Sequence, residues 1–131
     1  MPVRQLRLVV LADDFDAALA FYRDVLGMPE ADAVSSPGGR IAILDAGSAT
    51  IELTNLGHGE YIDRVEVGRR VAGHIRVALE VDDAAAATDA ARAAGATVIA
   101  EPVVTPWNSL NSRLEGEAGL QLTLFQELGS P

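Results

Sequence analysis

Residues 6–14 read Leu6-Arg7-Leu8-Val9-Val10-Leu11-Ala12-Asp13-Asp14, and residues 75–83 read Ile75-Arg76-Val77-Ala78-Leu79-Glu80-Val81-Asp82-Asp83. Both runs place an arginine second and a pair of aspartates last, and they lie 69 positions apart. Each run is apolar enough to form a strand, and each aspartate pair can cap the N-terminus of a helix. We therefore predict two copies of one module, each opening with a strand that is followed by a helix.

The same order of elements follows in both halves of the chain. The first half shows a helix from Asp13 to Gly27, a turn at 35–39 and strands at 40–44 and 49–54; the second shows a helix ending at Gly95 and strands at 97–104, 110–114 and 120–125. The predicted order is βαβββ in each half. The first module takes residues 1–57 and the second takes residues 73–131. Between them, residues 58–72 are predicted as a connector with at most a short helical turn.

Alternation within the strands gives the predicted sheet two unlike faces, because successive side chains point in opposite directions. One face carries leucine, isoleucine and valine and has to pack against a helix. The other face has mixed polarity and carries Arg7, Thr50, Glu52, Thr54, Arg76, Glu80, Gln121 and Thr123. Such a face cannot be a second packed core, so it is either solvated or lines a cavity.

Composition excludes several kinds of site. The 131 residues contain no cysteine and no lysine, which excludes thiolate chemistry and a Schiff-base lysine, and they contain only two histidines. The net charge of −9 disfavours nucleic acids and anionic membranes as partners. No signal peptide or membrane-spanning run is visible in the sequence, so we expect a soluble cytoplasmic protein.

The first predicted helix closes with the run Phe21-Tyr22-Arg23-Asp24-Val25-Leu26-Gly27-Met28. This run resembles the first-helix motif of the glyoxalase, bleomycin-resistance and extradiol-dioxygenase superfamily, whose fold is called vicinal oxygen chelate. The two strands that end in aspartate pairs and the Ile51-Glu52-Leu53 strand are similar to that family too, so the resemblance spans residues 3–127. It implies an α+β fold, in which two βαβββ modules form a cup-shaped curled mixed sheet around a ligand, and it implies a homodimer.

Metal-dependent members of that family hold their ion with one residue from each of the first, fourth, fifth and eighth strands. The corresponding positions here are Arg7, Glu52, Arg76 and Thr123, and only Glu52 matches the family. A guanidinium stays charged and has no lone pair to offer a cation. We therefore expect neither a metal ion nor another cofactor in this cup.

The side chains of Arg7, Glu52 and Arg76 form a predicted charge cluster that has two interpretations. Two arginines and one carboxylate leave one excess positive charge, which suits an anionic ligand because the guanidinium fork matches carboxylates. Alternatively, the three residues form a structural salt bridge that replaces the metal and joins the two modules. The two interpretations are compatible with each other.

The only tryptophan, Trp107, lies in a polar segment that borders the cup in members of that family. It predicts an aromatic wall for a flat ligand, with Asn108 and Asn111 as hydrogen-bonding groups at the rim. Gln121 and Thr123 are predicted to contact the ligand from the sheet opposite. The alternative is that Trp107 is a hydrophobic plug at a dimer interface, where tryptophan is also enriched.

The two histidines are weaker candidates for chemistry. His74 precedes Arg76 by two residues, which is about 6–7 Å along a strand. That distance is large for a displaced metal ligand, so we expect His74 at the rim. His58 and Glu60 form a His-x-Glu pair in the connector, a pattern more typical of solvated loop residues than of a metal site.

Two classes of function remain after these exclusions. The leading hypothesis is metal-independent binding of a small organic molecule, aromatic or anionic, in the cup. The alternative is an enzyme of the same superfamily: either a metal-dependent lyase, isomerase or dioxygenase that uses Glu52 with His74 or His58, or a metal-free enzyme with Glu52 as general base. Adjacent arginines are expected to depress the Glu52 pKa and weaken that base. A purely structural role has only the acidic surface in its favour.

Overall fold

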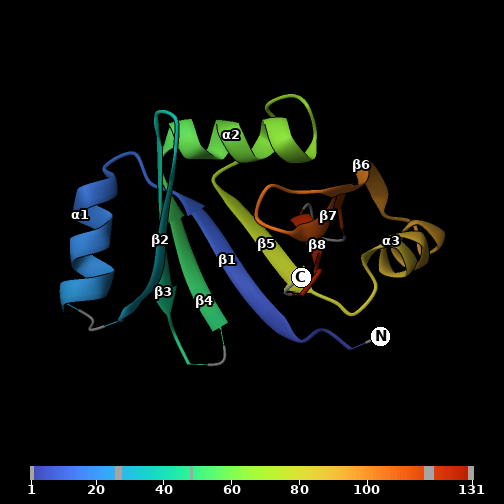
Figure 1. Cartoon of the computed structure of the whole chain (residues 1–131), viewed down its shortest axis with the longest axis horizontal. Helices are drawn as coiled ribbons and strands as arrows, with labels where there is room; N and C mark the ends of the chain where they lie inside the picture. The colour runs from blue at the N-terminus through green and yellow to red at the C-terminus, as the bar shows by residue number, and fades with distance from the viewer. Residues whose placement is uncertain (1, 26–27, 48, 117–119, 130–131) are drawn as a thin grey trace.

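The computed structural model describes residues 2–25, 28–47, 49–116 and 120–129, and these form one eight-stranded mixed sheet (Figure 1). The strand order is β2-β3-β4-β1-β5-β8-β7-β6. The first module contributes β1 (Gln5–Leu11), β2 (Glu30–Ser36), β3 (Gly39–Asp45) and β4 (Ala49–Thr54), and the second contributes β5 (Ile75–Glu80), β6 (Thr97–Val104), β7 (Ser109–Glu115) and β8 (Gln121–Glu127). Both halves thus have the expected βαβββ order, although the sequence predicts no residue range for β2, and the α+β class is confirmed.

The two modules meet at the centre of the sheet, where β1 and β5 pair antiparallel. On either side of this junction the pattern repeats, because β1 pairs parallel with β4 and β5 pairs parallel with β8. Val9 lies opposite Arg76, and Arg7 lies opposite Ala78. Directly opposite residues share a face of a sheet, so Arg7 and Arg76 project from the same face. One chain therefore supplies both halves of that face.

Aspartate caps begin two of the helices, as the sequence predicts. Asp14 accepts the amide of Ala17 at 3.0 Å before α1 (Phe15–Leu19), and Asp83 accepts the amide of Ala86 at 3.0 Å before α3 (Ala84–Ala93).

The first helix is less regular than predicted. It continues from α1 as the π-helix η1 (Ala20–Val25). The sequence does not reveal this change, because apolar spacing over so few turns does not distinguish the two pitches. The predicted stop at Gly27 lies outside the described residues.

Two separate cores lie on the face of the sheet away from the arginines. Phe15 and Leu19 of α1 pack against Ala42, Leu44 and Leu53. In the second module, α3 packs on a cluster with the members Val81, Ala84, Leu114 and Leu124. With the outer helices on this face, the opposite face is left for another element.

That element is a third helix, α2 (Leu56–Glu66), which lies in the segment predicted as a connector. The prediction of no more than a short helical turn is therefore wrong. The Asn55 side chain caps α2 by accepting the His58 amide at 3.0 Å, and it also accepts the Arg40 amide at 2.9 Å. Glycines made the segment look turn-like, but Gly57 is required by packing, since a Cβ there would overlap the Gly38 carbonyl oxygen. Tertiary contact thus outweighs helix propensity here.

None of the helices in the described part of the chain combines the length and apolarity needed to cross a bilayer.

The contact between α2 and the β2–β3 turn gives a direct test of this packing. We expect Gly57→Ala to lower the free energy of unfolding by about 1–3 kcal/mol, because the added methyl group overpacks a backbone contact. Alanine's better helix propensity would act in the opposite direction by about 1 kcal/mol. Urea denaturation followed by circular dichroism measures the change.

Gly73→Ala is the matched control, because a Cβ at Gly73 meets no atom within 4 Å. Its stability is expected to stay within about 0.5 kcal/mol of wild type. Equal stabilities of the two variants would contradict the proposed packing role of Gly57.

Candidate functional site

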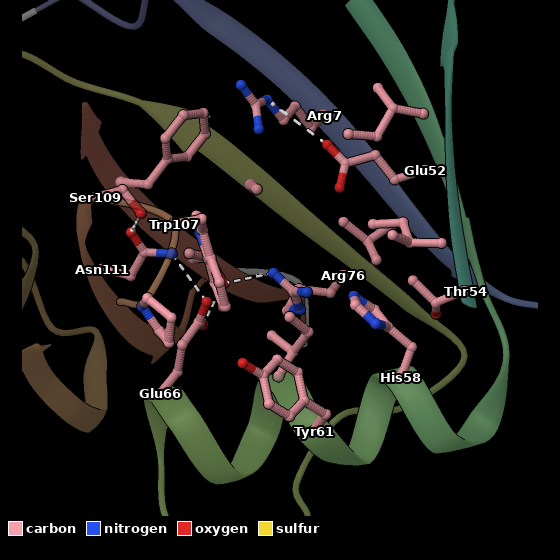
Figure 2. A pocket seen from close by; sticks show the side chains of 18 of the residues that line it. Arg7, Glu52, Thr54, His58, Tyr61, Glu66, Arg76, Trp107, Ser109 and Asn111 are labelled. Carbon is pink, nitrogen blue, oxygen red and sulfur yellow. Dashed lines mark hydrogen bonds and ion pairs between the residues drawn. The ribbon is translucent and has the colours of Figure 1, made fainter. Parts of the chain in front are cut away.

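A cavity of about 420 Å³ lies between the arginine-bearing face of the sheet and α2. Strands of both modules and α2 contribute to its walls, as Figure 2 shows. Its apolar lining consists largely of Val9, Ile41, Ile43, Ile62, Ala78 and Phe125. The mixed-polarity face predicted from the sequence therefore lines a cavity, and that cavity is built within a single chain.

The four residues at the family's metal-ligand positions all line this cavity. Arg76 Nη1 donates a hydrogen bond of 2.6 Å to Thr123 Oγ1. Arg7 Nε lies 3.6 Å from Glu52 Oε2, so these two residues form an ion pair without a hydrogen bond. The sequence repeat thus places the four side chains together, although Arg7 is 30% exposed whereas Arg76 is buried.

Glu52 is a buried acid with a poorly satisfied carboxyl group. It is 7% exposed, and its Oε2 atom has no hydrogen-bond partner. Burial raises the Glu52 pKa, and this effect exceeds the lowering by Arg7 and Arg76. The two arginines do act to lower the Glu52 pKa, as expected from the sequence, but the net shift is upward because desolvation of the carboxylate is the larger effect.

A buried ion network behind the cavity was not predicted from the sequence. Arg113 is 0% exposed, and its guanidinium contacts Asp63 Oδ1 at 2.7 Å and Glu66 Oε1 at 2.9 Å. Glu66 also accepts hydrogen bonds from Asn111 Nδ2 at 2.9 Å and from Thr123 Oγ1 at 3.3 Å. This network joins α2 to β7 and β8 and reaches the cavity wall through Glu66.

Two signals in the sequence could have indicated this network. Asn111 and Arg113 alternate along one predicted strand, which places them on the same face. Asp63 and Glu66 have the i, i+3 spacing of one helix face. The second signal was missed because their segment was interpreted as a connector.

The network changes the charge count in the cup. Arg113 adds one positive charge, and Asp63 and Glu66 add two negative charges, to the predicted cluster of Arg7, Glu52 and Arg76. Three guanidiniums then face three carboxylates. The predicted excess of one positive charge is therefore absent. Glu127 adds a further carboxylate at the rim, where it lies 3.7 Å from Arg7 Nη2.

The residues at the family's metal positions do not fit a metal ion. Arg76 is buried, and although burial lowers its pKa, a guanidinium offers no donor atom to a cation. The Thr123 hydroxyl is occupied by Arg76 and Glu66. Within the described residues, no three or more histidine, aspartate or glutamate side chains are grouped so that they could hold an ion. Glu52 is thus the only member of the four with an oxygen that suits a metal.

Of the predicted aromatic wall and its polar neighbours, Trp107 and Asn111 line the cavity and Asn108 does not. Trp107 lines the cavity, is 42% exposed, and has its ring centroid 6.4 Å from that of Tyr61 on α2. Asn111 lines the cavity too, but its side chain is bound to Glu66 and Ser109. Asn108 adopts a positive φ of 64° and donates to the Gly129 carbonyl at 2.6 Å, outside the lining residues.

Gln121 is not among the residues that line the cavity. Its Oε1 accepts a hydrogen bond from Arg113 at 2.8 Å, and its Nε2 donates to the Val71 carbonyl at 3.1 Å. One polar end of the side chain thus contacts Arg113 on β7, and the other holds the segment that follows α2. Thr123, predicted beside it, does line the cavity.

Neither histidine lies where the sequence predicted it. His58, expected to be solvated, is buried on α2, lines the cavity and lies 2.9 Å from Ser36 Oγ through its Nδ1. Burial and the nearby Arg76 lower the His58 pKa, so its ring is neutral at pH 7. Glu60 instead pairs with Arg70 at 3.6 Å. His74 is exposed, precedes β5 and lies outside this cavity.

Comparison with known families gives one match over most of the chain. A family model described as the Glyoxalase/Bleomycin resistance protein/Dioxygenase superfamily matches residues 4–124. Among curated proteins, CFP32, which carries a provisional glyoxylase name in Mycobacterium tuberculosis and Mycobacterium bovis, is 36% identical over 97 residues. That match covers 74% of this chain but 34% of CFP32, so the chain spans about a third of the length of these relatives.

Several solved structures share the fold at low sequence identity. Methylmalonyl-CoA epimerase from Streptomyces coelicolor is 20% identical with a TM-score of 0.70, covering 98% of this chain and 100% of its own. Hypothetical protein BH1468 from Bacillus halodurans is 17% identical with a TM-score of 0.70, covering 99% and 96% respectively. Methylmalonyl-CoA epimerase from Mycobacterium tuberculosis is 22% identical with a TM-score of 0.65, covering 98% and 88%. These likenesses establish the fold.

The buried carboxyl group of Glu52 predicts a pH-dependent stability difference. Below the ordinary glutamate pKa of 4.5, this carboxyl is protonated in both the folded and the unfolded chain. As the pH rises through the raised pKa of the folded state, the fold must hold a buried carboxylate, and the stability contributed by the protonated form is lost. Glu52→Gln removes this loss, so we expect the variant to exceed wild type by on the order of 1 kcal/mol at pH 8.

Urea denaturation at pH 4 and at pH 8 measures this difference, which is expected to shrink at the lower pH. Glu115→Gln, at an exposed carboxyl group, is the control and should show no such pH-dependent gain. A Glu52→Gln variant that is less stable than wild type at pH 8 would show that the arginines, not desolvation, dominate at this site.

Proposed function

Because this chain belongs to the Glyoxalase/Bleomycin resistance protein/Dioxygenase superfamily, we propose that it binds a small organic molecule in its cup without using a metal ion. One observation carries the proposal: a cavity of about 420 Å³ that combines apolar walls with a carboxyl oxygen of Glu52 that has no hydrogen-bond partner in the described structure. Ligand sites are typically concave and mostly apolar, with a small number of polar groups that fix orientation. A ligand would give the Glu52 oxygen the hydrogen-bond partner that it lacks among the described residues.

Metal independence is supported by the chemistry of the residues at the family's four ligand positions. Two of them are guanidiniums, and one of these, Arg76, donates to the Thr123 hydroxyl. A cation beside Glu52 would lie close to Arg7, whose Nε is 3.6 Å from the same carboxyl group. Repulsion between like charges opposes that arrangement.

An aromatic ligand is supported by the rings that line the cavity. Trp107 and Tyr61 form a tilted pair on the side of α2, and Phe125 lies on the sheet. Offset and edge-to-face contacts with such rings favour flat ligands. The Arg7 guanidinium already lies 4.5 Å from the Phe125 ring centroid, so the side with Trp107 and Tyr61 is the one available for stacking.

A second candidate function is favoured by the raised Glu52 pKa. A carboxylate whose pKa is raised is, once ionised, a stronger base than the ordinary carboxylate expected from the sequence. His58, held neutral on the opposite wall by burial, lines the same cavity. In a metal-free enzyme of this kind, Glu52 would take a proton from a ligand C–H, and the protonated acid would return it.

We also propose that the chain forms a homodimer and is located in the cytoplasm. The homodimer implied by the family resemblance is measurable by size-exclusion chromatography with light scattering. The expected cytoplasmic location is measurable by cell fractionation.

Filling the cavity tests the binding proposal. We expect a thermal-shift screen of small aromatic compounds to yield ligands that also change the emission of Trp107, the only tryptophan. Ala78→Phe places a ring in the cavity and is expected to weaken those ligands by about tenfold or more, because it occupies their space. Ile43→Phe does the same from another wall, in case Ala78→Phe disturbs the fold.

The control is Val104→Phe, at a position that is 65% exposed and outside the cavity lining; it should bind like wild type. Binding should also be unchanged after treatment with a chelator. Loss of binding on chelation, with recovery on adding a divalent ion, would refute metal independence. Unchanged affinity in both cavity-filling variants would refute the cup as the site.

The enzyme alternative predicts hydrogen exchange on a bound ligand. Ligands from the screen are incubated with the protein in D₂O and followed by proton NMR. If Glu52 is a general base, a C–H signal of a ligand decays with wild type, and the decay slows by about 100-fold or more with Glu52→Gln. No exchange in any ligand, with binding retained, would favour a binding protein over an enzyme.

A further inference from the structure

Strand β4 presents a row of three oxygen atoms that have no hydrogen-bond partner in the described structure. Thr50 Oγ1, Glu52 Oε2 and Thr54 Oγ1 are all buried without a hydrogen bond. Residues at i, i+2 and i+4 of a strand lie on one face, so the three form a line. Glu52 and Thr54 line the cavity, and Thr50 extends the row beyond it. Buried polar atoms are nearly always paired, and leaving one unpaired costs about 1–3 kcal/mol.

None of the neighbouring donors makes a hydrogen bond to this row in the described structure. Arg7 Nε donates to Gln5 Oε1 at 2.9 Å. Arg76 Nη1 donates to Thr123 at 2.6 Å. His58 Nδ1 is held by Ser36 at 2.9 Å. The cavity side of the row therefore has no hydrogen bond from the described part of the chain.

Apolar side chains flank Glu52 and Thr54 in this row. Ile43 lies directly opposite Glu52 on β3, and Ile41 lies opposite Thr54. On the other side, Val9 of β1 pairs with Glu52. All three of these apolar residues line the cavity. In such surroundings a hydrogen bond to the row is strong, and a ligand without a matching donor leaves the row unpaired.

Charge around the cavity argues against an ionic ligand of either sign. An anion would meet the carboxyl groups of Glu52, Glu66 and Glu127, which outnumber the two lining guanidiniums of Arg7 and Arg76. A cation placed on Glu52 would lie close to the Arg7 guanidinium, whose Nε is 3.6 Å from Glu52 Oε2, and would be repelled by it. A neutral donor meets neither form of repulsion.

We propose that the ligand is a neutral molecule, with an aromatic or aliphatic body, that presents N–H or O–H donors to Glu52 and Thr54 on β4. This inference rests on the proposed binding function and specifies the chemical class of its ligand. Amides, lactams and phenols belong to this class, whereas carboxylates do not. It replaces the anionic alternative that the sequence left open, because the positive charge on which that alternative depended is balanced.

Four single-ring probes that differ only in their polar group test the proposal: benzamide, methyl benzoate, benzoate and benzamidine. Binding is measured by Trp107 fluorescence and by ligand-observed NMR. We expect benzamide to bind about tenfold tighter than methyl benzoate, which lacks a donor, and than either charged probe. Tightest binding by benzoate or by benzamidine would overturn the proposal, as would equal binding of benzamide and methyl benzoate.

The double variant Glu52→Leu with Thr54→Val assigns the preference to this row. It removes buried unpartnered polar atoms and is therefore expected to fold. In this variant, benzamide should lose its advantage over methyl benzoate, while methyl benzoate binds at least as well as to wild type. Thr97→Val, at an exposed position on β6, is the control and should keep the preference. A preference for benzamide that survives in the double variant would overturn the assignment to β4.

These outcomes are separate from those of the cavity-filling test. If charged probes bind tightest and Ala78→Phe blocks them, the cup is the binding site and the proposed ligand class is wrong. If none of the four probes binds, the proposed class is again contradicted, and the thermal-shift screen with Ala78→Phe decides the binding function by itself.

Discussion

The buried contact of Arg113 with Asp63 and Glu66 is the interaction on which the cavity depends. It fastens α2 to β7, and Asp63 Oδ2 also accepts the amides of Val71 and Ala72, both at 2.9 Å, which fixes the chain leading into β5. Removing one partner would leave an uncompensated charge in the interior, at a cost of about 3–5 kcal/mol. Without α2 in this position, the polar face of the sheet would be open to water and Glu52 would lose the burial that raises its pKa.

This network also explains why two similar modules produce one site. Arg7 and Arg76 occupy equivalent positions in the repeat, but Arg7 stays partly exposed near the rim, whereas Arg76 is buried with Thr123 and close enough to Glu66 to feel its charge. The sequence suggested a structural salt bridge among Arg7, Glu52 and Arg76, whereas the buried salt bridge is centred on Arg113. Glu66 of α2 takes part in it, and Glu52 is left facing the cavity without a hydrogen bond to its Oε2 atom.

A large part of the fold could be predicted from the sequence because it depends on local rules. The repeated strand and aspartate pair predicted β1, β5 and the caps at Asp14 and Asp83, and alternation placed Arg7, Glu52, Arg76 and Thr123 on one face. The helix α2 could not be predicted in this way. Its glycines allow close approach to the β2–β3 turn, and that reason is visible only when Gly57 is seen against Gly38.

The sequence by itself determined which side chains share the polar face, since the period of a strand is a property of the backbone. Only the tertiary structure decided what those side chains do there. The pKa of Glu52 and the charge balance of the cup depend on desolvation by α2 and on carboxylates that lie far along the chain, at Asp63 and Glu66. Burial and Coulomb interactions depend on distance in space, and strand periodicity carries no information about the residues that approach from another element.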